Sequence, residues 1–149
     1  MKKFSITLLV LIVLAFGIYF VIGLFNAKPP SPIITVEEKK IEVAQGSYCW
    51  DGLYNSICVD TLSPPMLIDH HEIKPVIISP ESELKIEFNK EPNKNTLGVN
   101  RWLNDNEVKN ISLSNNVLIA PKEKGVYVYD VHARWEKGDS SYAFVIEVR

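Results

Sequence analysis

Two runs of alternating residues near the end of the chain restrict its fold more than any other feature. Aromatic or branched apolar residues occupy most odd positions of residues 127–135 and the even positions of residues 142–148. Polar residues fill many of the positions between them. Alternation with period two is typical of a strand with one buried face. Because a short turn around Gly138 joins the two runs, they predict an antiparallel β-hairpin.

Shorter runs of the same type precede this hairpin. They lie at residues 33–36, 41–44, 47–50, 74–79, 84–88, 97–103, 108–113 and 117–120. Turn-favouring residues separate several of them, including Asn104-Asp105-Asn106 and Asn115-Asn116. No window outside the N-terminal segment shows helical periodicity. Roughly seven to nine short strands in a domain of this length predict an all-β antiparallel sandwich, with a jelly roll or small barrel as alternatives.

The closing hairpin also resembles that of a known group of proteins. Bacterial immunoglobulin-like envelope domains end with segments similar to Gly125-Val126-Tyr127-Val128-Tyr129, Trp135, Gly138 and Tyr142-Ala143-Phe144. With Gly46-Ser47-Tyr48-Cys49-Trp50 added, the chain resembles small, uncharacterised membrane-anchored or secreted proteins of Gram-positive bacilli. The resemblance implies an immunoglobulin-like sandwich and brings no catalytic residue with it. Tyr127 and Tyr129 stand where such sandwiches often carry a tyrosine corner.

The N-terminal segment predicts a membrane anchor. No residue between Phe4 and Ala27 is charged, and a helix of about 20 apolar residues can cross the hydrocarbon core of a bilayer. Lys2 and Lys3 precede the segment, which favours a cytoplasmic N-terminus and an extracytoplasmic remainder in a single-pass protein of the cell membrane. A cleaved signal peptide is the alternative. We therefore expect a transmembrane helix within residues 1–27, a proline-rich spacer at 28–32 and an extracytoplasmic β-sandwich at 33–149.

Charge and cysteine content narrow the possible partners and chemistry. The net charge of the chain is −2, and its basic residues form no evident patch or stripe, which argues against a nucleic-acid partner. Cys49 and Cys58 both lie in the predicted exported domain. Outside the cytosol, an even pair of cysteines close in sequence predicts a structural disulfide. Their spacing does not match a zinc pair or a typical redox motif.

The loop closed by this disulfide is the predicted binding surface. It contains Trp50, Tyr54 and Asn55, and aromatic side chains are common at the energetic centres of interfaces. The alternative is that Trp50 and Tyr54 pack over the disulfide as part of a small core. The expected partners are another envelope protein, a peptide or a cell-wall polymer.

Two histidine-containing clusters suggest alternative functions. Asp69-His70-His71-Glu72 is the one cluster of potential metal ligands, although adjacent side chains on a strand face opposite ways and nearby prolines indicate a solvated loop. Asp130 and His132 share one face of a predicted strand, where an exposed, mixed-charge strand explains them without catalysis. No serine lies in a nucleophile-elbow pattern. The sequence thus predicts a non-enzymatic binding module without cofactor or metal; a ligand or metal sensor and an envelope enzyme are the alternatives.

Overall fold

The computed structural model describes residues 2–25, 28–52, 55–105 and 107–149. Its elements, in chain order, are α1 (Lys2–Phe25), β1 (Pro32–Val36), β2 (Lys39–Ile41), β3 (Ala44–Asp51), β4 (Ser56–Val59), α2 (Pro64–His70), β5 (Val76–Ile78), β6 (Glu83–Phe88), β7 (Gly98–Asn104), β8 (Glu107–Ile111), β9 (Val117–Ile119), β10 (Gly125–Trp135) and β11 (Gly138–Val148). The predicted turn at residues 104–106 ends at Asn106, which lies outside the described residues.

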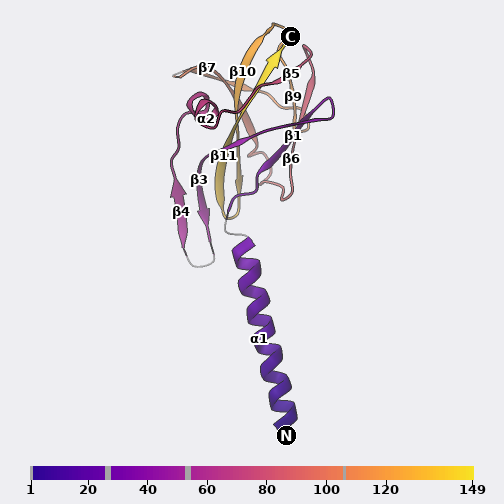
Figure 1. Cartoon of the computed structure of the whole chain (residues 1–149), viewed down its shortest axis with the longest axis vertical. Helices are drawn as coiled ribbons and strands as arrows, with labels where there is room; N and C mark the ends of the chain where they lie inside the picture. The colour runs from indigo at the N-terminus through magenta and orange to yellow at the C-terminus, as the bar shows by residue number, and fades with distance from the viewer. Residues whose placement is uncertain (1, 26–27, 53–54, 106) are drawn as a thin grey trace.

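Two sheets enclose one hydrophobic core (Figure 1). The smaller sheet has the strand order β2-β1-β6-β9, and the larger has the order β4-β3-β11-β10-β7-β8. All of these neighbours are antiparallel, while the short β5 runs parallel to the end of β11. Ile34 and Leu84 of the smaller sheet share the core with Val131 and Phe144 of the larger. The predicted antiparallel, mostly β fold is confirmed, and it is consistent with a β-sandwich.

The closing hairpin is present as predicted. β10 and β11 pair without interruption from Gly125↔Val148 to Trp135↔Gly138. The side chains expected inside are buried, with Tyr129 and Trp135 exposed by only 1% and 2%, except for Tyr127, which is partly buried. At the start of β10, the Tyr127 hydroxyl donates a 2.8 Å hydrogen bond to the Glu123 carbonyl oxygen. This is the upstream backbone contact that defines a tyrosine corner.

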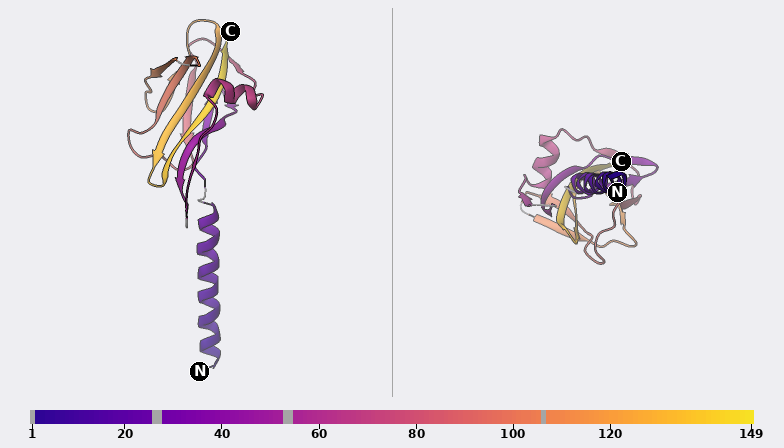
Figure 2. Two further views of the ribbon diagram at one scale, coloured as in Figure 1. Left: turned by 90° about the vertical axis from the view of Figure 1, so that its left-hand side faces the viewer. Right: turned by 90° about the horizontal axis from the view of Figure 1, so that it is seen from below.

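Helix α2 corrects the sequence prediction, which found no helical periodicity outside the N-terminal segment and expected residues 69–72 to lie in a solvated loop. Pro64 and Pro65 occupy the first helical positions, where the missing N–H would have no partner within the helix in any case. Leu67 and Ile68 are buried on the outer face of the larger sheet. There they join a second hydrophobic cluster with Ala143 and Val145 of β11 (Figure 2). Burial of this face, rather than a long periodic pattern, stabilises the short helix.

The N-terminal segment forms α1, which extends away from the β-sheets (Figure 2). The side chains described in α1 are those of residues 6–21, and they are exposed. Among the residues that the structure describes, no helix has both the length and the hydropathy required of a membrane span. After the helix, Pro29 is buried, and the Tyr142 hydroxyl donates a 2.6 Å hydrogen bond to the Pro30 carbonyl oxygen. The predicted spacer is therefore attached to the sheets along part of its length.

Candidate functional site

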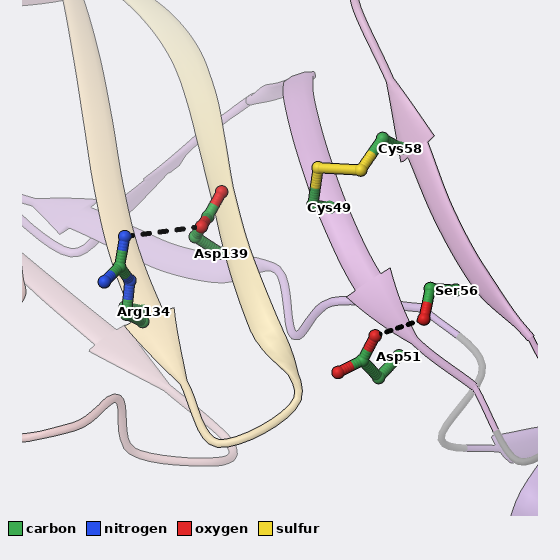
Figure 3. The surroundings of a disulfide bond; sticks show 6 residues. All are labelled: Cys49, Asp51, Ser56, Cys58, Arg134 and Asp139. Atoms are coloured by element: carbon green, nitrogen blue, oxygen red, sulfur yellow. Dashed lines mark hydrogen bonds and ion pairs between the residues drawn. A yellow bond between two sulfur atoms is a disulfide. The ribbon is translucent and has the colours of Figure 1, made fainter.

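The segment that sequence analysis selected for binding is a β-hairpin. Cys49 of β3 and Cys58 of β4 form the predicted disulfide, and they face each other directly across the two strands. Near the hairpin end, the Ser56 hydroxyl donates a 2.5 Å hydrogen bond to the Asp51 carboxylate (Figure 3). Strand β4 was not predicted. The disulfide thus links two paired strands rather than closing an irregular loop.

The structure divides the three predicted binding residues. Trp50 is only 3% exposed, and its ring packs edge-on against Trp135 with 5.8 Å between ring centroids. Trp50 is therefore buried, as the alternative interpretation expected, but it belongs to the main hydrophobic core rather than to a small core of its own. Asn55 is exposed at the end of the hairpin. Tyr54 lies outside the described residues.

The histidine pair proposed as a metal-ligand cluster lies at the end of α2. The His70 and His71 rings are in edge-on contact, with 5.2 Å between their centroids, and both residues are exposed. Within the described part of the chain, no group of three or more histidine, cysteine, aspartate or glutamate side chains is placed to hold a metal ion. The described residues of this segment therefore do not provide the ligands that the metal-sensing alternative requires.

A polar groove lies instead on the outer face of the larger sheet, beside the part that α2 covers. Its volume is about 470 Å³, and the residues that line it are Ser47, Thr96, His132, Ala133, Arg134, Asp139, Ser140 and Ser141. A recess of about 160 Å³ shares Ser47 and Ser141 with the groove and extends to Pro64 and Leu67 of α2. Strands β3, β10 and β11, together with Thr96 before β7, therefore build the groove, and the recess adjoins it.

Two glycines in neighbouring strands leave room for the side chains of the groove. A Cβ atom at Gly98 of β7 would collide with the imidazole of His132, its partner on β10. A Cβ atom at Gly46 of β3 would collide with the Ser141 hydroxyl on β11. Glycine inside a strand often marks such a close approach. The Nε2 end of the imidazole can therefore lie close to β7, and the hydroxyl can lie close to β3.

A chain of polar contacts runs across β8, β7 and β10 to the groove. Asn110 Nδ2 donates a hydrogen bond to Asn100 Oδ1, and Asn100 Nδ2 donates one to Asp130 Oδ2. The donor–acceptor distance is 3.3 Å in each bond. His132 Nδ1 lies 3.6 Å from the same Asp130 oxygen. Interaction with the Asp130 carboxylate, through hydrogen bonding and charge, raises the pKa of His132 above its usual value, while partial burial acts in the opposite direction. The imidazole is thus held in place and favoured in its charged form.

A second oppositely charged pair lies at the open end of the groove. Arg134 Nη2 is 3.7 Å from Asp139 Oδ2, beside the disulfide-linked hairpin (Figure 3). Both side chains are mostly exposed, so the energy of this pair is small. Together with His132 and Asp130, this gives the groove two pairs of one basic and one acidic side chain.

The arrangement does not pair a nucleophile with a base. His132 Nδ1 is directed to Asp130 and Nε2 lies over Gly98, which is on the side of β10 opposite Ser141. The Ser141 hydroxyl instead donates a 3.1 Å hydrogen bond to the carbonyl oxygen of Ser47. Nucleophilic catalysis by serine requires a base within hydrogen-bond reach of the hydroxyl. His132 is therefore not placed to act as a base toward Ser141.

Comparisons with known proteins add nothing to this description, because no family model, curated protein or solved structure matches the chain. Sequence analysis identified Asp130 and His132 as neighbours on one strand face but did not place Ser47, Thr96 or Ser141 beside them. The available signal was Gly98 inside the predicted strand at residues 97–103 and Gly46 between the predicted strands at 41–44 and 47–50. Without the strand order, that signal does not say which side chains approach each glycine.

Proposed function

We propose that this protein is a non-catalytic binding module of the cell envelope, built on an immunoglobulin-like sandwich and held at the outer face of the membrane. The observation that carries the proposal is the polar groove beside α2. The groove is a defined hollow whose polar side chains form hydrogen bonds with other groups of the protein. Most of its lining residues belong to strands, which fix their positions. Sites on rigid strands hold binding groups more precisely than sites on loops.

The immunoglobulin-like assignment is supported by strand order. β6 and β9 are neighbours in one sheet, while β8, β7, β10 and β11 are consecutive in the other. This matches the B–E pair and the C′–C–F–G series of immunoglobulin domains. The tyrosine corner at Tyr127 supports the same assignment, since it stands at the start of the strand equivalent to F. On this basis the β3–β4 hairpin and α2 are additions to the common framework.

The membrane location rests on the sequence. The charge-free stretch between Phe4 and Ala27 and the lysines before it support an N-terminal anchor with the β-sheets outside. The disulfide between Cys49 and Cys58 supports the same side, because such bonds persist outside the cytosol. The contact of Tyr142 with Pro30 would then hold the sheets close to the anchor rather than on a long flexible tether.

Site-specific photocrosslinking in native membranes tests the binding role. Leu62 is 45% exposed at the edge of the recess, so Leu62→p-benzoylphenylalanine places a photoreactive group there without removing a polar contact. Ile119→p-benzoylphenylalanine, on the edge strand of the other sheet, is the matched control because Ile119 is 51% exposed. We expect a discrete adduct from position 62 and none from position 119. Adducts from position 119 alone, or from neither position, would contradict a binding role for the groove.

A further inference from the structure

We propose that the ligand of the groove is an uncharged carbohydrate segment, an inference that rests on the binding role proposed above. Three properties of the described residues lead to it. The groove offers polar groups that can both donate and accept hydrogen bonds, each of its basic side chains has a carboxylate beside it, and its floor offers no free sheet edge for a peptide.

The first property is the chemistry of the lining. Ser47, Thr96 and Ser141 contribute hydroxyl groups to the groove, and Thr61 contributes another to the recess. A hydroxyl group has one donor and two acceptor lone pairs, so it keeps hydrogen-bonding capacity after one internal bond. The hydroxyl groups of a sugar have the same dual capacity. A polyhydroxylated ligand can therefore exchange bonds with this lining in either direction.

The second property is the balance of charge. Each basic side chain in the groove already has a carboxylate beside it, with His132 3.6 Å from Asp130 and Arg134 3.7 Å from Asp139. An anionic ligand would compete with these carboxylates for the same cations, and a cationic ligand would compete for the carboxylates. An uncharged ligand does not compete with either member of a pair, and it can form charge-assisted hydrogen bonds with both pairs.

The third property distinguishes a carbohydrate from a peptide. The backbone groups of the floor are engaged in the β3-β11-β10-β7 part of the larger sheet, so they do not offer an edge for strand addition. Ala133 has the largest apolar side chain among the residues that line the 470 Å³ groove, and the larger apolar side chains, those of Leu62, Pro64, Leu67 and Trp102, are confined to the smaller recess. Peptide and protein interfaces instead depend on aromatic or large apolar anchors in pockets.

Trp102 provides the aromatic surface that a sugar ring can pack against. It lines the recess with Asp130 and Thr61, and it is partly exposed. An indole ring is a large apolar surface with little conformational freedom to lose. The C–H face of a sugar ring can lie on it while the hydroxyl groups reach the polar lining. The groove and recess together fall within the size range of small-molecule sites.

A glycan array probed with the detergent-solubilised full-length chain tests the ligand class. The array carries uncharged glycans such as chitotetraose and maltotetraose, anionic glycans such as tetragalacturonate, cationic chitosan oligomers and immobilised peptides. We expect binding to one or more uncharged glycans, followed by titration calorimetry of the strongest. Binding to charged glycans only, to peptides only, or to no uncharged glycan would overturn the inference.

Three variants connect that binding to the groove. Gly98→Ala pushes the imidazole of His132 out of position, and we expect a loss of affinity of about tenfold or more. Arg134→Gln alters an exposed side chain with little risk to folding, and we expect a loss of about threefold to tenfold. Lys85→Gln, on the other sheet, should leave affinity unchanged. Equal affinity in Gly98→Ala, Arg134→Gln and the control would place the glycan elsewhere and contradict the inference.

Asp139→Asn tests the charge argument separately. It removes one carboxylate and leaves the groove with an excess positive charge next to Arg134. We expect this variant to gain measurable binding to tetragalacturonate, which the natural chain should bind at least about tenfold more weakly. Equal binding of tetragalacturonate by both proteins would show that charge balance does not select the ligand.

The failure of this inference can be told apart from failure of the binding role. A protein adduct from position 62 with no glycan binding would preserve the binding role and reject the carbohydrate. The absence of both an adduct and glycan binding would reject both. A glycan adduct from position 62 that disappears in Gly98→Ala would support both.

Discussion

The outer face of the larger sheet has two halves that differ in what covers them, although β10 and β11 run through both. In the covered half, Ala143 and Val145 of β11 pack beneath Leu67 and Ile68 of α2. In the open half, Ser141 of β11 and His132 and Arg134 of β10 line the groove. Since the two strands keep one register throughout, the difference lies in the residues that point outward. One half of the face contributes to folding, and the other half is available for a ligand.

The polar half is stable without a cover because most of its groups are satisfied within the protein. Asp130 accepts from Asn100, and Ser141 donates to the carbonyl oxygen of Ser47. Buried polar groups are costly only when they lack such partners. The same internal bonds fix the side chains before a ligand arrives, which reduces the entropy cost of binding. The covered half has no such requirement, because its side chains are apolar.

The largest loss of stability is expected from Trp135→Ala, which removes a core side chain behind the open half. The indole is 2% exposed, contacts Phe88 and Trp50, and donates a 2.9 Å hydrogen bond to the Lys90 carbonyl oxygen. Loss of a buried indole should lower the free energy of unfolding by about 3–5 kcal/mol. Urea denaturation of the detergent-solubilised chain, followed by circular dichroism, measures this change. A decrease below about 0.5 kcal/mol would mean that the inner face of β10 is not the core.

Leu67→Ala tests the cover itself. Leu67 is 4% exposed between α2 and β11, so its truncation should lower the free energy of unfolding by about 2–4 kcal/mol. Met66→Ala is the matched control, because Met66 belongs to the same helix and is 47% exposed; its effect should stay within about 0.5 kcal/mol. If both variants unfolded with the same free energy, α2 would not act as a cover, and the contrast between the two halves would fail.

Removal of the disulfide tests whether the hairpin beside the open half depends on a covalent link. Cys49 and Cys58 are nine residues apart, and closing a loop of this size contributes about 2–3 kcal/mol in the chain-entropy model. The double variant Cys49→Ser, Cys58→Ser should therefore lower the free energy of unfolding by that amount. Reduction of the natural chain with dithiothreitol should reproduce the loss, and the same treatment should not affect the variant. Unchanged stability in both cases would mean that strand pairing alone holds the hairpin.

The parts of the fold that were predictable from sequence are those with long local patterns. The β10–β11 hairpin follows from alternation over two runs of residues, and its inward face was assigned correctly down to Trp135. Helix α2 was missed because seven residues are too few to display a helical period and because Pro64-Pro65 suggested a loop. The available clue was the apolar character of Ala143 and Val145 at outward positions, which requires a covering element.

The groove could not be predicted, because it depends on strand order rather than on local pattern. Its lining comes from segments around residues 47, 96, 132 and 141, which lie far apart in the chain. Sequence analysis favoured Trp50 because aromatic residues near a disulfide suggested an exposed loop. In β3, however, the side chain of Trp50 points inward, and alternation along a strand decides this direction. The strand β4 that fixes the hairpin carries too short an apolar run to have been identified.

The smallest expected effect is a pH-dependent contribution from His132 in the open half. The pKa of His132 is raised in the folded chain by Asp130, whereas an unfolded histidine titrates near about 6.5. The pair should therefore stabilise the fold fully below that value, and the contribution should disappear as pH rises through the folded pKa. Because the side chain is 42% exposed, solvent screening limits the effect to less than about 1 kcal/mol.

Urea denaturation of the natural chain and of His132→Gln, at about pH 5.5 and about pH 8.5, measures this contribution. We expect the difference in free energy of unfolding between the two proteins to be larger at the lower pH, since more of the imidazole is charged there. Asp130→Asn is the matched control, because it keeps the side-chain shape and removes the negative charge; His132→Gln in that background should give a difference that no longer increases at the lower pH. A difference that grows as pH rises would mean that the imidazole is held neutral. In that event the groove would carry net negative charge, and a cationic ligand would fit the open half better than an uncharged one.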